Sequence, residues 1–157
     1  MQKYPSPSEE PRVRMIELRL AAAEPRTLYR VLGPRDVAHL LRDLVGDADR
    51  EHFVAVYLDA AHQATHVHTV SVGTLNSTLV HPREVFKGAL LANSQALVVG
   101  HNHPSGTVTP SKEDRVVHEQ LTQAGELLGI RSLDSIIVGP TPAFYSFADS
   151  SEATFAA

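Results

Sequence analysis

The sequence has no cysteine among its 157 residues. This absence excludes a disulfide framework and any metal site built on thiolates, so a transition metal would have to be held by His, Asp or Glu. No apolar run approaches the roughly 20 residues that a membrane-spanning helix needs. The first residues also lack the basic-then-apolar layout of a secretory signal. Together these absences predict a cytoplasmic protein with no membrane segment.

The chain also lacks a large excess of charge of one sign, because its formal net charge is only −4. Residues 1–50 carry nine basic and eight acidic side chains, whereas residues 51–157 carry five basic and ten acidic ones. Phosphate binding usually leaves a cluster of Lys and Arg, so the acidic second part argues against a nucleic-acid face there. The length predicts one domain, and the 43% apolar and 20% charged residues are typical of an ordinary globular protein.

The first part of the chain changes from a proline-rich start to regular patterns. Residues 1–14 contain three prolines among Ser and Glu, which predicts a disordered N-terminal segment before a single domain over residues 15–157. Residues 15–22 alternate between apolar and polar side chains, so we expect a strand there. A helical pattern opens at Pro34, continues with apolar residues every three or four positions, and ends at Gly46.

Strands and helices then alternate along the rest of the chain. Residues 51–59 are apolar on both faces, which predicts a central strand, and residues 65–73 indicate its antiparallel neighbour. Further patterns predict a helix from Pro82 to about Asn93, a buried strand over 96–100, a helix from the cap Ser111 to Gly129, and strands over 133–138 and 144–147. The expected fold is a mixed α/β domain of the α+β type, with a largely antiparallel sheet and two or three flanking helices.

A His-x-His pair directly follows the buried strand. In an extended segment, side chains two residues apart point to the same side, so His101 and His103 can present their imidazoles to one point. Asp114 lies one turn into the next helix, and the loop of residues 104–110 is long enough to bring its carboxylate there. Three such ligands would leave the fourth position of a zinc ion to water, which is typical of a catalytic site.

Each half of this pattern also has an ordinary structural interpretation. Two histidines beside a turn are common by chance, and Ser111-x-x-Asp114 can be a helix cap whose acidic group complements the helix dipole. The conjunction of both halves, with ten residues between His103 and Asp114, favours the metal site. We expect no metal binding by His66 and His68, because this second pair has no acidic third ligand at suitable spacing. His81 is expected at the start of a helix, with a pocket role left open, and the remaining histidines are expected to be surface or half-buried side chains; they are His39, His52, His62 and His118.

The segments around this pattern resemble a known family. His101-Asn102-His103-Pro104 with Ser111-x-x-Asp114 resembles the JAMM signature of JAB/MPN-type metalloproteins. Three further stretches are similar to the RadC family within that group: Gly73-Thr74-Leu75-Asn76, His81-Pro82-Arg83-Glu84-Val85 and Ala124-Gly125-Glu126-Leu127-Leu128-Gly129-Ile130. The resemblance covers roughly residues 50–148. It implies a JAB1/MPN-like fold, related to that of cytidine deaminases, with a mixed sheet between helices.

The resemblance also implies roles for individual residues. His101, His103 and Asp114 would hold zinc, and Glu51 matches the glutamate that serves JAMM domains as general acid and base. From the residues alone, Glu51 would be a solvated charge at the start of a strand. Ser111 matches the serine that supports the tetrahedral intermediate. The implied activity is that of a zinc-dependent metallopeptidase or isopeptidase with a peptide or protein substrate.

Two other hypotheses stay open. RadC proteins are associated with DNA repair and recombination, and a metal-bound hydroxide can attack phosphodiesters, so a nuclease or DNA-binding accessory protein is the alternative. However, only about 50 residues precede Glu51, too few for the helical DNA-binding module that usual RadC proteins carry. Asp134-Ser135 stands where relatives often have Asp-His, so we assign this pair no role. A non-catalytic scaffold is the third hypothesis, and a homo-oligomer is compatible with each.

Overall fold

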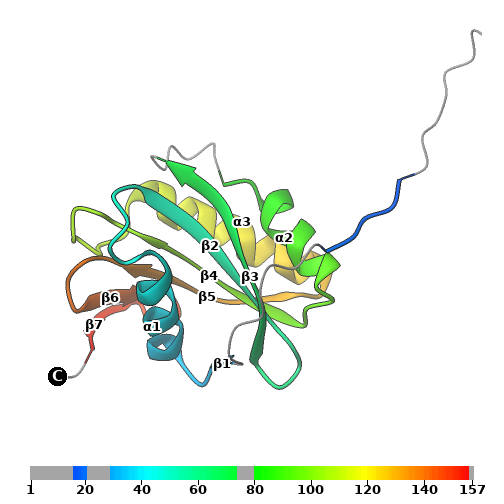
Figure 1. Cartoon of the computed structure of the whole chain (residues 1–157), viewed down its shortest axis with the longest axis horizontal. Helices are drawn as coiled ribbons and strands as arrows, with labels where there is room; N and C mark the ends of the chain where they lie inside the picture. The colour runs from blue at the N-terminus through cyan, green and yellow to red at the C-terminus, as the bar shows by residue number, and fades with distance from the viewer. Residues whose placement is uncertain (1–15, 21–28, 74–79, 156–157) are drawn as a thin grey trace, which may run out of the picture.

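The computed structural model describes residues 16–20, 29–73 and 80–155, and all elements named here lie within those ranges (Figure 1). The helices are α1 (Pro34–Val45), α2 (Pro82–Leu91) and α3 (Lys112–Leu128). The strands are β1 (Tyr29–Arg30), β2 (Glu51–Leu58), β3 (Gln63–Gly73), β4 (Ala96–Asn102), β5 (Arg131–Val138), β6 (Ala143–Ser146) and β7 (Ser151–Thr154). These strands form a single sheet in the order β1-β3-β2-β4-β5-β6-β7.

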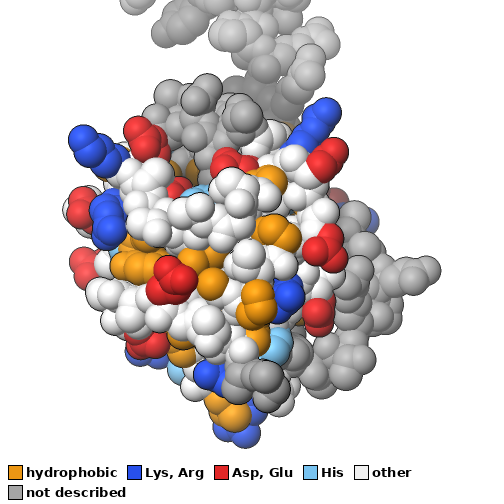
Figure 2. Space-filling model, turned by 90° about the vertical axis from the view of Figure 1, so that its left-hand side faces the viewer, with side chains coloured by type: hydrophobic (Ala, Val, Ile, Leu, Met, Phe, Trp, Pro, Cys, Tyr) orange, Lys and Arg blue, Asp and Glu red, His pale blue; other side chains and the backbone are white. Residues whose placement is uncertain are grey.

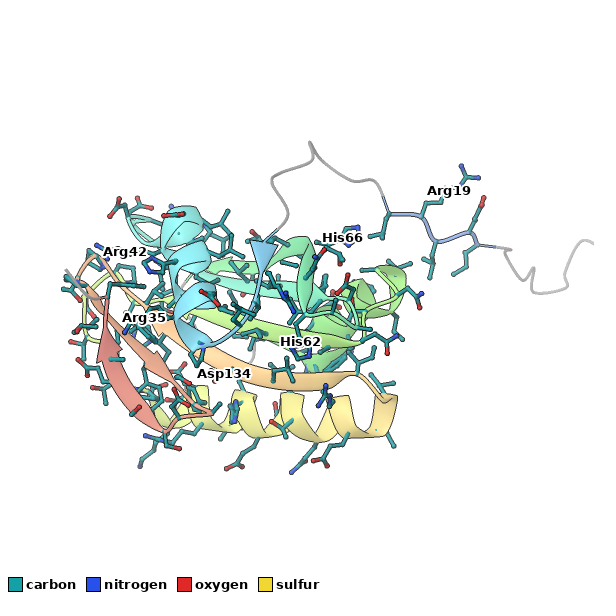
Figure 3. All side chains as sticks on the ribbon, turned by 90° about the horizontal axis from the view of Figure 1, so that it is seen from below. Arg19, Arg35, Arg42, His62, His66 and Asp134 are labelled. Carbon is teal, nitrogen blue, oxygen red and sulfur yellow. The ribbon has the colours of Figure 1, made fainter. Side chains whose placement is uncertain are left out.

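The sheet lies between helices on both of its faces, with α1 on one side and α3 on the other (Figure 3). One core cluster joins α1 to the sheet through residues such as Leu41, Val54 and Val98. The other joins α2 and α3 to the opposite face through Phe86, Leu121 and their neighbours. Alternate residues of β2 and β4 therefore enter different cores, which explains why these strands are apolar on both faces.

The parallel pairing of β4 with β5 determines where the C-terminal end of β4 and the N-terminal end of α3 lie. β2 is antiparallel to both of its neighbours, β3 and β4. β4 and β5 pair in parallel, and such a pair needs a crossover, which α3 provides. Because α3 runs back along the sheet, its N-terminal end lies close to the C-terminal end of β4, on the left in Figure 1. The predicted His-x-His pair and the predicted cap therefore meet at one end of the sheet.

The ends of α3 follow from its sequence. Ser111 is the N-cap in extended conformation, and Gly129 follows the last turn with a φ of 69°, in the left-handed region that glycine adopts without strain. The cap predicted at Ser111 and the helix end predicted at Gly129 are both confirmed. No helix within the described ranges is long and apolar enough to cross a membrane.

The predicted fold class is confirmed: the sheet is mixed, mostly antiparallel and flanked by helices. The strand predicted at residues 15–22 is wrong over its described part, since residues 16–20 have no regular secondary structure and Ile16 is 79% exposed. Alternating side chains stabilise a strand only where another strand pairs with it, and none of the described strands pairs with this segment. The predicted disordered segment, residues 1–14, lies outside the described residues.

Candidate metal centre

The structure brings the three predicted ligands together at the end of β4. His101 Nε2 lies 2.9 Å from His103 Nε2 and 3.2 Å from Asp114 Oδ1, while His103 Nε2 lies 3.6 Å from Asp114 Oδ2. One donor atom from each of the three residues lies within 4.8 Å of the others. The cluster can hold a metal ion, and within the described residues it is the one group of three His or acidic side chains with this property.

The two histidines are held by different parts of the fold. His101 is 4% exposed, on the face of β4 that α3 covers, and its ring stacks on Phe53 of β2 at a centroid distance of 5.9 Å. His103 lies just beyond the strand, where its backbone N–H donates to the Val138 carbonyl at 2.8 Å. Its Nδ1 lies 2.6 Å from the Thr107 carbonyl, which can only accept. In the neutral imidazole Nδ1 therefore carries the hydrogen and the lone pair of Nε2 points at the cluster, whereas in the protonated imidazole Nε2 donates to Asp114.

Asp114 is held by a reciprocal cap at the start of α3. The Ser111 N–H donates to Asp114 Oδ2 at 2.8 Å, and the Asp114 N–H donates to Ser111 Oγ at 3.0 Å. The cap engages one carboxylate oxygen and leaves Oδ1 beside His101. The Ser111 hydroxyl accepts in this arrangement, so the cap does not use its hydrogen. Capping and metal binding are thus compatible functions of the same two side chains.

The cluster favours the ionised form of Asp114. Burial by itself raises the pKa of this carboxyl group, but hydrogen bonds from His101, His103 and the Ser111 N–H bring the pKa well below its ordinary value. Burial likewise lowers the pKa of His103, yet the contacts with Asp114 and the Thr107 carbonyl and the charge of Glu51 leave it raised. An ionised carboxylate is the form that a metal ion requires of Asp114.

Glu51 lies beside the cluster at the start of β2, where it pairs with Gly73 of β3. Its charge acts on His103, as the raised pKa of that imidazole indicates. Glu51 also lines a surface pocket of about 410 Å³, and the other lining residues are Asp49, Arg50, Gly73 and Pro104. The residue that the family resemblance singled out is therefore a half-buried carboxylate between a cleft and the cluster.

The remaining histidines have other partners. His68 Nδ1 lies 3.1 Å from the Tyr57 hydroxyl, and His81 caps α2, with Nδ1 accepting from the backbone N–H two residues on at 3.3 Å. His118 Nδ1 lies 2.8 Å from Ser135 Oγ, and burial lowers the pKa of this imidazole. These contacts agree with the structural roles expected for the histidines outside the His-x-His pair.

Asp134, for which no role was predicted, is a buried structural residue. Its Oδ1 accepts from the backbone N–H groups of Ser135 at 2.7 Å and Ala148 at 2.9 Å, and its Oδ2 accepts from the Ser146 hydroxyl at 2.7 Å. These bonds join β5 to β6 and to the turn that follows β6. Burial raises the pKa of this carboxyl group despite the three donors.

The fold and the cluster define an α/β domain with a candidate metal site, in which a central strand and the next helix provide the candidate ligands. The chain belongs to the RadC family, since the model of the RadC-like JAB domain matches residues 31–152. Its membership agrees with the resemblance seen in the sequence.

Several curated proteins are similar to this chain. A UPF0758 protein of Rubrobacter xylanophilus is 50% identical over 109 residues, which cover 69% of this chain and 48% of that protein. A UPF0758 protein of Desulforamulus reducens is 46% identical over 121 residues, or 77% of this chain and 53% of that protein. One of Methanosarcina acetivorans is 46% identical over 110 residues, or 70% and 48%. The chain therefore spans about half the length of these relatives.

Proposed function

We propose that this domain is a zinc-dependent hydrolase of the JAMM type that cleaves peptide or isopeptide bonds. The observation that carries the proposal is the convergence of His101 Nε2, His103 Nε2 and an oxygen of Asp114 on one point, with Glu51 beside it. Membership of the RadC-like JAB family supports the reaction class, and the resemblance to the JAMM pattern places these four residues at its matching positions.

The donor set fits zinc better than calcium or magnesium. Zinc binds imidazole nitrogen and carboxylate oxygen at about 2.0–2.2 Å, so the ligand atoms of a tetrahedral site lie about 3.3–3.5 Å apart. Here His101 Nε2 lies 2.9 Å from His103 Nε2 and 3.2 Å from Asp114 Oδ1, while His103 Nε2 lies 3.6 Å from the other carboxylate oxygen, Oδ2. Calcium and magnesium prefer sites made of oxygen alone, which the two imidazoles disfavour. Three protein ligands also match a catalytic zinc site, which keeps one position open.

The side chains around the cluster have complementary tasks in such a reaction. Zinc, when bound, supplies a Lewis acid that makes water nucleophilic near neutral pH. The Glu51 carboxylate takes a proton from the attacking water and passes it to the amine nitrogen as the C–N bond breaks. The Ser111 hydroxyl hydrogen, which the helix cap does not use, donates to the oxyanion that forms on the carbonyl oxygen of the substrate.

The test is Glu51→Gln, which keeps the size of the side chain and removes its ability to take a proton. We expect zinc-loaded wild type to cleave members of a panel of peptides and Lys-ε-linked isopeptides. The variant should keep its zinc and lose turnover by about 10²–10⁴-fold. Asp49→Asn is the matched control, because it neutralises an exposed carboxylate that lines the same pocket and should leave turnover unchanged.

Two results would contradict the proposal. In the first, Glu51→Gln keeps wild-type turnover. In the second, zinc-loaded wild type cleaves no member of the panel. DNA included in the panel tests the nuclease alternative, which has less support because Lys and Arg side chains are scattered over the described part of the face in Figure 2 and form no continuous patch there. Mononuclear zinc also differs from the two-metal sites common in nucleases.

A further inference from the structure

Asn102 separates the two histidines of the cluster in sequence, yet its side chain lies on the other face of β4. It is the last residue of the strand and is 0% exposed. Successive side chains of a strand point to opposite faces, so His101 faces the metal cluster while Asn102 faces the segment that leads from α1 into β2. The amide is therefore no candidate ligand, and its burial needs another explanation.

Three hydrogen bonds account for that burial. Asn102 Oδ1 accepts from the His52 N–H at 2.7 Å, while Nδ2 donates to the carbonyls of Arg50 at 2.9 Å and Ala48 at 3.4 Å. The orientation of the amide is unambiguous, because an N–H group faces its oxygen and two carbonyls face its nitrogen. Of the side chains of this size, only asparagine offers an acceptor and two donors. Aspartate would place a carboxylate oxygen against the two carbonyls.

Two of these bonds lie on either side of Glu51, at residues 50 and 52. The backbone pairing of β2 with β4 begins only at Phe53 opposite His101. It does not extend to Glu51, because the chain turns away from β2 after Asn102. The backbone N–H of His103 bonds instead to the carbonyl of Val138 in β5. The Asn102 side chain thus supplies the link to β4 that the backbone does not make at the start of β2.

We propose that Asn102 is a positioning residue that holds the Glu51 carboxylate at the metal cluster. The inference rests on the proposed hydrolase function, in which Glu51 takes a proton from water and its carboxylate oxygen must lie within about 2.6–3.2 Å of the water oxygen. Residues 101–103 then hold three parts of the site. His101 and His103 present their imidazoles to the metal cluster, and the Asn102 amide holds the backbone on both sides of Glu51 from the other face of β4. A displacement of about 1 Å in such a group can cost about 10²-fold in rate.

The experiment compares Asn102→Ala and Asn102→Asp with wild type, all loaded with zinc. We expect kcat to fall by about 10–10²-fold while KM and zinc affinity stay within about twofold. Crystal structures of the zinc-loaded proteins should show the Glu51 carboxylate displaced and both imidazoles in place. The control is Ser146→Ala, which removes a hydroxyl that is 1% exposed and bonded to Asp134 at 2.7 Å. This variant should be less stable than wild type, but its kcat and the position of Glu51 should be unchanged.

The two measurements separate this inference from the function on which it rests. If wild type cleaves no substrate, the hydrolase proposal fails, and a displaced Glu51 in the variants still supports the positioning role. If wild type is active and the variants keep both kcat and the position of Glu51, the inference is overturned alone. Asn102→Ser replaces Asn102→Ala if the latter does not fold. Should no Asn102 variant fold, the residue serves stability and the positioning role is rejected.

Discussion

Two buried aspartates of this domain, Asp114 and Asp134, lie in clusters of polar groups but differ in how their oxygens are satisfied. Asp134 is 5% exposed and meets only hydrogen-bond donors: two backbone N–H groups and the Ser146 hydroxyl. Asp114 is 9% exposed, and one oxygen accepts from a backbone N–H while the cluster of imidazoles surrounds the carboxylate. Similar burial therefore accompanies two different environments.

The difference separates a structural site from a site built for a cation. Every oxygen of Asp134 is paired within the fold, and burial raises its pKa. At Asp114 the imidazoles lower the pKa of the carboxyl group when they donate to it, and neutral His103 directs the lone pair of Nε2 toward the carboxylate, which is itself an acceptor. Acceptors that converge on one point repel one another unless a proton or a metal ion lies between them. This arrangement, rather than burial or histidine content, identifies the candidate metal centre.

The largest expected effect comes from neutralising Asp114. Asp114→Asn should weaken zinc binding by more than about 10²-fold, because removing partners of metal ligands already costs about 10–10²-fold and this change affects a ligand itself. Competition with a fluorescent chelator measures the affinity. Asp134→Asn makes the same chemical change in the other cluster, and its zinc affinity should stay within about twofold of wild type, as expected for a site that holds no metal. Equal losses in both variants would erase the distinction.

At Asp134 we expect a smaller effect, which changes stability and leaves zinc binding intact. Asp134→Ala leaves two backbone N–H groups and the Ser146 hydroxyl without an acceptor in the interior, which should lower the free energy of unfolding by about 2–3 kcal/mol. For a chain of this size, that corresponds to a fall in Tm of about 4–12 °C. Thermal denaturation of the metal-free protein measures the change, and the folded variant should still bind one zinc. A stable variant that has lost zinc binding would mean that Asp134 belongs to the functional site.

Much of the fold could be predicted because its local signals are strong. Pro34, Pro82 and Ser111 begin helices, Gly129 ends one, and the apolar residues of β2 and β4 indicate central strands. β1 has two residues, too few for a period to emerge, and β7 has only one apolar residue, Ala153, so neither could be predicted. The strand predicted at residues 15–22, which is wrong over residues 16–20, had the right alternation, but pairing depends on a partner that a local pattern does not specify.

The residues of the candidate site could likewise be predicted only in part. Spacing and the alternation of side chains sufficed to select His101, His103 and Asp114, whereas Glu51 entered only through the family resemblance, because its place beside the cluster depends on how β2 pairs with β4. The Thr107 contact had no signal, since any residue offers a carbonyl. For Asn102, the alternation of side chains along the strand indicates only the face opposite to His101, because its three partners lie about 50 positions earlier in the chain.

The most direct test of the metal centre is a crystal structure of the zinc-loaded protein with anomalous data collected at the zinc edge. The expected result is one zinc per chain, bound by His101 Nε2, His103 Nε2 and one carboxylate oxygen of Asp114 at about 2.0–2.2 Å, with a fourth ligand that is not a protein atom. A zinc ion bound elsewhere, or a fully loaded protein in which the two imidazoles point apart, would contradict the account.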